Sequence, residues 1–261
     1  MPQPRVSIPG IEALDLRGTR RVITPLHDYL HECIIDGRIP PGTTLSQVAL
    51  ARQLGVSVTP VREVLRMLQE EGLVEFEPNQ RMRVTGIDPV DVDVTYAARI
   101  MLECLAVAMT VNELSAEQRR QAESTLTAMS RAARVPDQTR WFSAHGEFHR
   151  LLATGASDPL HSQLRNLADR SARYMHIRQE LDPQDWPQAG NVEHRAIFEA
   201  VSAGDESAAV SLTAHHLERT ARRVVAGCAP DFVLKAVPKA LATVRAASSD
   251  ATARLMSVGG S

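Results

Sequence analysis

Two histidines stand four residues apart in the segment HGEFHRLL, residues 145–152. On a helix this spacing places both imidazoles on one face, one turn apart. Trp141, Phe148 and Leu152 fall on the same stripe, which is the face that a helix normally buries. Imidazole nitrogens bind Zn, Ni, Cu or Co better than Mg or Ca. The two histidines are therefore candidate metal ligands, although a histidine on an apolar face is more often a core residue.

The composition is that of an ordinary globular protein. The 261 residues are enough for two domains, and 44 % of them are apolar and 23 % charged. No apolar run approaches the ~18 residues of a membrane span, and the N-terminus MPQPRVSIPG lacks the apolar segment of a signal peptide. Cys33, Cys104 and Cys228 are widely spaced and form no CxxC, as expected for reduced thiols in the cytoplasm. The net charge of −2 argues weakly against a large nucleic-acid footprint.

The first third of the chain carries helix, turn and hairpin signals in a defined order. Residues 1–18 hold three prolines and predict a flexible arm, and helical spacing of apolar residues predicts a helix over 22–35. LSQVALARQLG predicts a short helix capped by Ser46 and ended by Gly55, and VREVLRMLQEEG predicts another. LVEFE and MRV alternate as strands do, with PNQR as the hairpin tip. Residues 19–87 thus have the outline of a winged helix-turn-helix, with a generic small α+β domain as the alternative.

Beyond residue 88 the strand signals end. Five or six helical segments, separated by Pro, Gly and Asp, predict an all-helical bundle over 88–229, and SAEQ at 115–118 has the form of a capping box. The residues after 230 are rich in Ala, Ser and Gly and predict a weak helix or a loose tail over 230–261. Two apolar stripes are expected to face the core: Met101, Cys104, Leu105, Ala108 and Met109 in the first helix, and Val210, Ala214, Leu217, Ala221 and Val224 in a later one. The expected fold class is mainly α.

The segment LARQLGVSVTPVREVLRMLQEEGLV resembles the GntR superfamily of bacterial transcription factors, whose usual form is LA-x-x-LGVSRTPVREAL-x-x-LE-x-EGLV. The helical region resembles the FCD effector domain of the FadR branch. There AARIMLECLAVAM matches the R-x-x-x-E opening helix, and FH, EH and HHL follow in the family's order. The resemblance covers about residues 20–227 and implies a cytoplasmic transcriptional regulator that is not an enzyme.

The resemblance implies that the helix from about Thr59 to Glu71 enters the major groove of an operator. Short hydroxyl side chains and backbone N–H groups at a helix N-terminus bind phosphate, and arginine forks bind guanine. Val58 stands where the family has arginine and Arg81 where the wing has glycine, so recognition is expected to be weaker or directed at another sequence. A homodimer on a palindromic site is expected. The implied DNA-binding residues are Ser57, Val58, Thr59, Pro60, Arg62, Arg81 and Arg83.

The resemblance also implies a metal site. In FCD domains that bind metal, one aspartate and three histidines from separate helices hold a divalent ion. The corresponding histidines here are His149, His194 and His216, the last chosen over His215 because it directly precedes an aliphatic residue. His145 occupies the aspartate position. We predict a divalent transition metal, most readily Zn or Ni, and the loss of the anionic ligand favours an anionic effector.

Arg99 and Glu103 lie one turn apart on the first bundle helix. They are either a surface salt bridge or, as the family implies, part of a site for a carboxylate effector, with Arg173 and Tyr174 as further lining residues. The leading hypothesis is a DNA-binding regulator that is switched by a small carboxylate bound beside the metal. The alternatives are a metal sensor whose effector is the ion itself, and a metalloenzyme with a histidine site. No membrane partner is expected.

Overall fold

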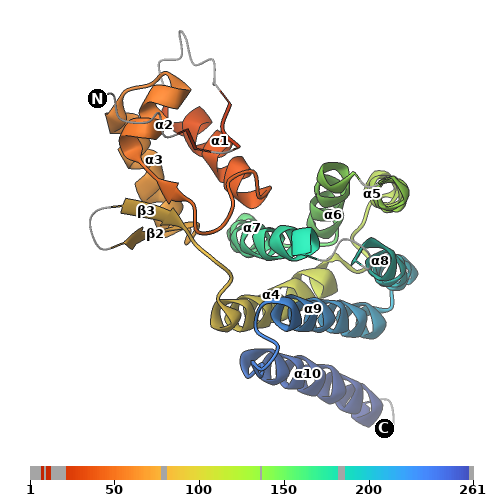
Figure 1. Ribbon diagram of the computed structural model, residues 1–261. Coiled ribbons are helices and arrows are strands. Elements are labelled where there is room, and N and C mark those ends of the chain that lie inside the picture. Colours follow the sequence, from red (N-terminus) through yellow and green to blue (C-terminus); the bar gives the residue numbers. More distant parts are fainter. Residues whose placement is uncertain are drawn as a thin grey trace, which may run out of the picture. The chain divides into compact units, whose positions relative to one another are not determined.

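The chain forms two compact units, residues 1–87 and 88–261. The computed structural model shown in Figure 1 describes residues 7–8, 10–12, 22–77, 81–135, 137–181 and 186–258. These residues form ten helices and one small three-stranded sheet. The prediction of a mainly α protein, with a winged helix-turn-helix followed by a helical bundle, is confirmed. No helix among the described residues is both long and apolar enough to cross a membrane.

Unit 1 has the predicted order of helices and hairpin, with one additional strand. Its sheet is antiparallel in the order β1-β3-β2, and Leu45 of β1 pairs with Met82 of β3. The first strand has only two residues, which is too short to give an alternating pattern in the sequence. The hairpin tip at 78–80 lies outside the described residues. The elements are α1 (Ile23–Ile35), β1 (Thr44–Leu45), α2 (Gln47–Leu54), α3 (Val58–Glu70), β2 (Val74–Glu77) and β3 (Arg81–Val84).

The turn between α2 and α3 is built by the caps that the sequence predicts. The Ser46 hydroxyl accepts a hydrogen bond from the Ala49 N–H at the start of α2. Gly55 ends that helix with a φ of 69°, a left-handed conformation that glycine adopts without strain. Helix α3 starts at Val58, three residues before the segment VREVLRMLQEEG predicted from periodicity. Its buried side chains, Val61, Val64, Leu65 and Leu68, anchor it in the unit's core.

The N-terminal arm contributes to the core of unit 1. Most of residues 1–18 lie outside the described residues, but Ile8 and Ile11 are buried. The Gln53 side chain bonds the backbone N–H of Ile8 and the carbonyls of Ile8 and Ile11. The expectation of a flexible arm is therefore wrong for these residues, because a side-chain amide 42 or more residues away takes up their backbone hydrogen bonds.

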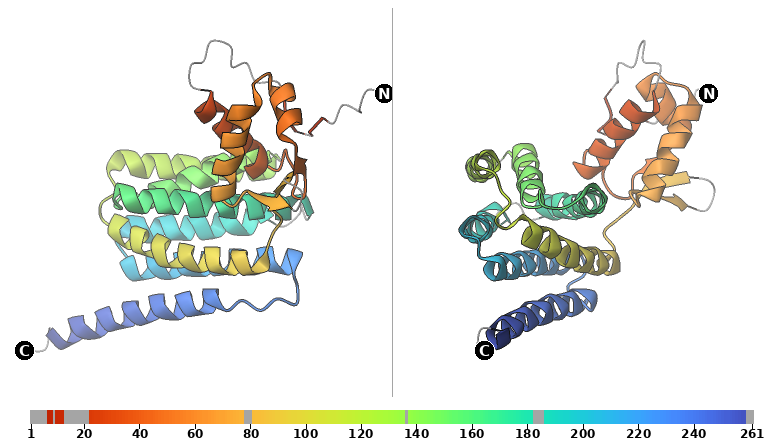
Figure 2. Two further views of the ribbon diagram at one scale, coloured as in Figure 1. Left: turned by 90° about the vertical axis from the view of Figure 1, so that its left-hand side faces the viewer. Right: turned by 180° about the vertical axis from the view of Figure 1, so that it is seen from behind.

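Unit 2 is an all-helical bundle whose helices run side by side (Figure 2). Helix α9 packs against α4, α7 and α8, α4 also packs against α7, and α5 packs against α6 and α8. The predicted core stripe of α9 is confirmed, since all five of its residues are buried, and the predicted capping box is present at Ser115 and Gln118. The helices are α4 (Pro89–Thr110), α5 (Ala116–Arg134), α6 (Gln138–Leu151), α7 (Asp158–Leu181), α8 (Trp186–Ala203), α9 (Glu206–Cys228) and α10 (Ala236–Val258).

The predicted core stripe of α4 is wrong in three of its five positions. Met101, Leu105 and Met109 are 40 %, 52 % and 42 % exposed. The buried face of α4 is the one that carries Arg99 and Glu103 as well as apolar residues. Because this charged pair is buried, the apolar row with Met101, Leu105 and Met109 faces outward. Exposed Val90 and Val94 continue this row toward the N-terminus of the helix.

After residue 230 the chain forms helix α10, which packs on α4 and α9. Figure 2 shows it as an outer layer of unit 2. Its start is fixed by Asp93 of α4, whose carboxylate accepts hydrogen bonds from the backbone N–H groups of Lys235, Ala236 and Val237. An anion at a helix N-terminus satisfies donors that have no partner within the helix. Of the weak helix and the loose tail expected here, the structure has a helix.

Candidate functional site

The N-terminal end of α3 presents short polar side chains. Ser57 is the N-cap residue, but its side chain makes no capping hydrogen bond, and both Ser57 and Thr59 are exposed. Val58 is partly buried and packs against the core of unit 1. Pro60 fits the first turn of a helix because the N–H that it lacks would have no partner there. The helix therefore exposes hydroxyl groups beside backbone N–H groups that have no partner within the helix.

A groove in unit 1 brings three arginines together. It is lined by Arg62 and Arg66 of α3 and by Arg81 of β3. The Nε of Arg62 donates to the side-chain oxygen of Gln47 at 3.3 Å, which orients its guanidinium. Arg83 does not line the groove, since its Nε donates to the carbonyl of Gly42 at 3.0 Å.

Sequence reasoning missed Arg66, which follows Arg62 by one helical turn and thus lies on the same face. It also missed two exposed apolar side chains in this groove, Val48 and Phe76, which are 56 % and 53 % exposed. The groove therefore offers cations for phosphate or base edges, together with apolar surface.

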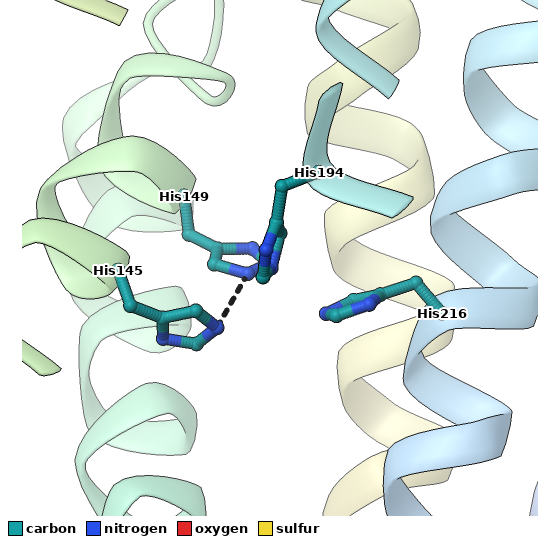
Figure 3. Close-up of side chains that lie close together, drawn as sticks. All are labelled: His145, His149, His194 and His216. Carbon is teal, nitrogen blue, oxygen red and sulfur yellow. Dashed lines mark hydrogen bonds between the residues drawn. The ribbon is translucent and has the colours of Figure 1, made fainter. Parts of the chain in front are cut away.

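Four imidazoles meet in the interior of unit 2. His145 and His149 come from α6, His194 from α8 and His216 from α9, and Figure 3 shows the rings directed toward one another. One ligand atom from each residue can be chosen so that all four lie within 4.8 Å of one another. The Nε2 atoms of His145 and His149 are 3.2 Å apart. His215, the neighbour of His216, is instead exposed and contacts the Ser211 carbonyl and Arg245.

Burial favours the neutral form of His145, His194 and His216. Desolvation, and after it the charge of neighbouring histidines, lowers the pKa of His145 and of His194 well below the usual value. Desolvation also lowers the pKa of His216, against the opposing effect of Glu193. Neutral imidazole is the form that binds a metal. His194 is fully buried, and neither of its ring nitrogens has a hydrogen-bond partner within the described residues.

Two carboxylates orient the cluster from outside. Glu103 of α4 contacts Nδ1 of His149 at 3.1 Å, and Glu193 of α8 contacts Nδ1 of His216 at 2.8 Å. In metal sites such contacts at one ring nitrogen fix the tautomer and leave the other nitrogen for the ion. Sequence reasoning did not assign Glu193, although its position directly before His194 was a signal that it lies near the cluster.

Arg99 and Glu103 form a buried ion pair. The Nε of Arg99 donates to Glu103 at 2.5 Å, and the two side chains are only 3 % and 11 % exposed. Burial by itself raises the pKa of Glu103, but the charge of Arg99 and the hydrogen bond with His149 outweigh it and lower the pKa to about 2. The alternative of a surface salt bridge is therefore wrong, because the pair lies inside the bundle and continues to His149.

Arg173 and Tyr174 lie in a different network on α7. Both are buried, and the Tyr174 hydroxyl donates to Asp91, which also accepts from Arg170. Of the four residues expected to bind an effector, Glu103 lines a cavity beside the histidines, together with His149 and Thr213 among others. Arg99 contacts the cluster through Glu103. The structure thus brings Arg99 and Glu103 to the histidines, while Arg173 lies over the ring of Tyr174 and Tyr174 contacts Asp91.

Comparison with known proteins places each unit in a sequence family. Residues 24–84 match the gntR family of bacterial regulatory proteins, and residues 94–219 match the FCD domain. YdhC of Bacillus subtilis, described as an uncharacterised HTH-type transcriptional regulator, is 30 % identical over 190 residues, which cover 70 % of this chain and 82 % of that protein.

Two further comparisons agree with this assignment. A probable D-xylose utilization operon transcriptional repressor of Paenarthrobacter nicotinovorans is 29 % identical and covers 79 % of this chain and 91 % of its own. The crystal structure of a putative GntR regulator from Rhodococcus sp. RHA1 superposes with a TM-score of 0.69 at 25 % identity, covering 78 % of this chain and 97 % of that one. The matched families and relatives are transcriptional regulators and not enzymes.

Proposed function

Since the chain belongs to the GntR family of bacterial transcriptional regulators and carries an FCD domain, we propose that it binds a palindromic operator as a homodimer. We further propose that a small carboxylate, bound at a metal in unit 2, controls this binding. The observation that carries the proposal is the buried cluster of four imidazoles with two outer carboxylates. A ligand can change DNA affinity only if it binds one arrangement of the protein better than another.

The cluster fits a divalent transition metal. Neither ring nitrogen of the fully buried His194 has a hydrogen-bond partner among the described residues, which would cost free energy in a metal-free core. One coordinate bond would remove part of that cost. His145, His149, His194 and His216 would hold the ion, with Glu103 and Glu193 orienting two of the rings. A set of neutral imidazoles favours Zn or Ni over Mg or Ca. The ion would supply positive charge and coordination positions for the oxygens of an anion.

The DNA interface would be the groove of unit 1 with the exposed end of α3. Ser57, Thr59 and the first backbone N–H groups of α3 suit phosphate, and Arg62 and Arg66 suit phosphate or guanine. Arg81 at the start of β3, in the wing, would contact the phosphate backbone of the DNA. Val58 adds no donor at this end of the helix, and its partial burial in the core gives it a packing role.

A homodimer is supported by the outer face of α4. Its exposed apolar side chains repeat along the helix and would be covered by an equivalent face in a two-fold dimer. A dimer would also present two copies of α3 to the two halves of a palindrome. The row consists of Val90, Val94, Met101, Leu105 and Met109.

A metal sensor is the second candidate, and one observation favours it. Four protein ligands fill a tetrahedral site, which leaves no open position for an effector. In that case the ion alone would change the affinity for DNA. If instead His145 does not bind the ion, the other three histidines leave coordination positions open for a carboxylate.

The test measures metal content and DNA binding together. Untagged protein is analysed for metals, and fluorescence anisotropy with an operator selected from a random duplex library is then measured for metal-free, zinc-loaded, and zinc- plus malonate-containing protein. We expect about one ion per chain and an affinity that changes only when malonate joins the metal. A change with zinc alone supports the sensor. Protein that binds neither Zn nor Ni overturns the proposed metal site. Protein that selects no operator from the library overturns the proposed DNA binding.

A further inference from the structure

The groove of unit 1 that carries three arginines also has an apolar part. The groove has a volume of about 1020 Å³, and its lining includes Val48 at the start of α2 and Phe76 of β2. Of the three exposed large apolar side chains in the described part of unit 1, these are two. A single exposed apolar residue is common on a protein surface, but two that line one groove mark a binding surface.

Neither of these side chains is needed to fill the core. Helix α2 contributes Leu50 and Leu54 to the core, whereas Val48 is more than half exposed. Phe76 pairs across the hairpin with Met82, and cross-strand partners project from the same face of a sheet. Met82 is buried and Phe76 is exposed, so the ring of Phe76 extends from the edge of the core into the groove. Both side chains thus offer apolar surface to an occupant of the groove.

The charge of the groove indicates what kind of molecule could occupy it. Arg62, Arg66 and Arg81 line it, and none of the described residues that line it carries a carboxylate. Such a surface attracts a polyanion and disfavours a purely apolar partner, because the guanidinium groups would lose hydration without gaining acceptors. DNA supplies both components. Its phosphate oxygens and guanine acceptors suit the arginines, and the 5-methyl group of thymine in the major groove suits apolar side chains.

Arg62 connects the charged and the apolar parts of the groove. Its Nε donates to the side-chain oxygen of Gln47 at 3.3 Å, and Gln47 is uncharged, so this bond orients the guanidinium without neutralising it. The bond uses Nε and leaves the two terminal nitrogens for O6 and N7 of guanine. Val48 directly follows Gln47 at the start of α2. The side chain of Val48 would therefore lie beside the base that Arg62 contacts.

We propose that Val48 and Phe76 recognise the 5-methyl group of thymine in the operator, beside the base that Arg62 contacts. Thymine carries this methyl group in the major groove and cytosine lacks it, so an apolar contact there favours T·A over C·G. Residues 57–60 at the start of α3 hold no charged side chain, so base recognition depends more on the groove. The inference rests on the proposed operator binding and names two residues that determine its specificity.

The test removes the methyl group from the DNA. The full-length protein selects an operator from a random duplex library, and each thymine of one half-site is then replaced in turn by deoxyuridine. Deoxyuridine lacks only the 5-methyl group and keeps the same base pairing. Fluorescence anisotropy gives Kd for each duplex. We expect replacement at one or two thymines to raise Kd about four-fold, the effect of losing one buried methyl group, while the other replacements leave Kd unchanged.

Two variants connect this effect to the protein. Val48→Ala should raise Kd for the unmodified operator and give the same Kd for the thymine and deoxyuridine duplexes, because the contact with the methyl group is gone. Alanine favours a helix more than valine does, and the site is exposed, so this variant should fold. Phe76→Ala tests the wing in the same way. Val135→Ala is the matched control, since Val135 is exposed at the end of α5 in unit 2, and it should keep both Kd and the deoxyuridine effect.

The outcomes separate this inference from the proposed function. Loss of the deoxyuridine effect in Val48→Ala or in Phe76→Ala supports the inference and assigns the contact to α2 or to the wing. Operator binding that no deoxyuridine replacement weakens overturns the inference and leaves the proposed DNA binding standing. A deoxyuridine effect that persists in both variants overturns it as well. Protein that selects no operator contradicts the proposed function, and the inference fails with it.

Discussion

Replacing Arg99 by alanine should strongly destabilise unit 2. Arg99 is 3 % exposed, and its partner Glu103 is 11 % exposed and also contacts His149. Truncation of the arginine leaves a carboxylate inside the bundle without its counter-charge. Such a change costs far more than the loss of a surface pair, because water cannot replace the missing partner.

The magnitude follows from the electrostatics of Glu103. Its pKa falls from 4.5 to about 2 in the folded protein, where Arg99 and His149 overcome the opposing effect of burial. A shift of this size corresponds to about 3 kcal/mol, and removing one partner of a buried ion pair costs about 3–5 kcal/mol. We therefore expect Arg99→Ala to lower the free energy of unfolding of unit 2 by about 3 kcal/mol.

Urea unfolding followed by tryptophan fluorescence measures this quantity in the full chain. The protein has two tryptophans, Trp141 and Trp186, and both belong to unit 2, so the signal reports that unit. Chelator in the buffer removes the contribution of any metal. Arg222→Ala provides the matched control, since it breaks an exposed i,i+4 pair with Glu218 and should cost about 0.3–0.5 kcal/mol.

Two results would refute the reasoning. The first is a cost for Arg99→Ala no larger than that for Arg222→Ala. The second concerns pH: because the folded pKa of Glu103 lies below the unfolded value of 4.5, its stabilisation is complete above that pH and is lost as pH falls toward about 2. The difference between wild type and Arg99→Ala should therefore shrink over this range, and a difference that grows on acidification contradicts the assignment.

Four other perturbations have defined outcomes. Arg62→Ala should weaken operator binding by about 1–3 kcal/mol in fluorescence anisotropy if it reads a base edge, and equal affinity would remove it from the interface. His149→Ala should abolish the fall in melting temperature that chelator causes in wild type, as measured by differential scanning fluorimetry. Leu105→Glu should convert the proposed dimer to a monomer in light scattering, because it places charge in the exposed row of α4. Asp93→Ala removes the acceptor at the start of α10 and should speed cleavage after Lys239 by a lysine-specific protease; unchanged cleavage would show that packing alone holds the helix.

The sequence was sufficient where local chemistry decides the structure. Ser46 and Gly55 bracket α2 because a hydroxyl cap and a left-handed glycine act within a few residues. The inward direction of His145 and His194 likewise followed from the apolar residues that share their helical faces. The choice of His216 over His215 needed the family resemblance, since periodicity does not separate two adjacent residues.

The sequence was insufficient where two helical faces compete for burial. In α4 the row with Met101 and Leu105 is more apolar than the face with Arg99 and Glu103. Hydrophobic periodicity therefore predicts that this row is buried. The structure instead buries the face of α4 that carries Arg99 and Glu103. These two charges pair with each other, and Glu103 also contacts His149 on another helix. Glu103 and His149 are 46 residues apart, so a local hydrophobic pattern cannot predict their contact. The interaction of Gln53 with the N-terminal segment was missed for the same reason.

The same long-range contacts bear on the replacement of the family's aspartate by His145. A ligand set of neutral imidazoles carries no charge. Among the described residues, Glu103 and Glu193 are the carboxylates that contact the cluster. Each of them is already paired with an arginine, Glu103 with Arg99 and Glu193 with Arg219. These pairs orient His149 and His216 while adding no net charge, and a bound divalent ion would keep its full positive charge. The substitution thus supports the proposal that an anion binds at the metal.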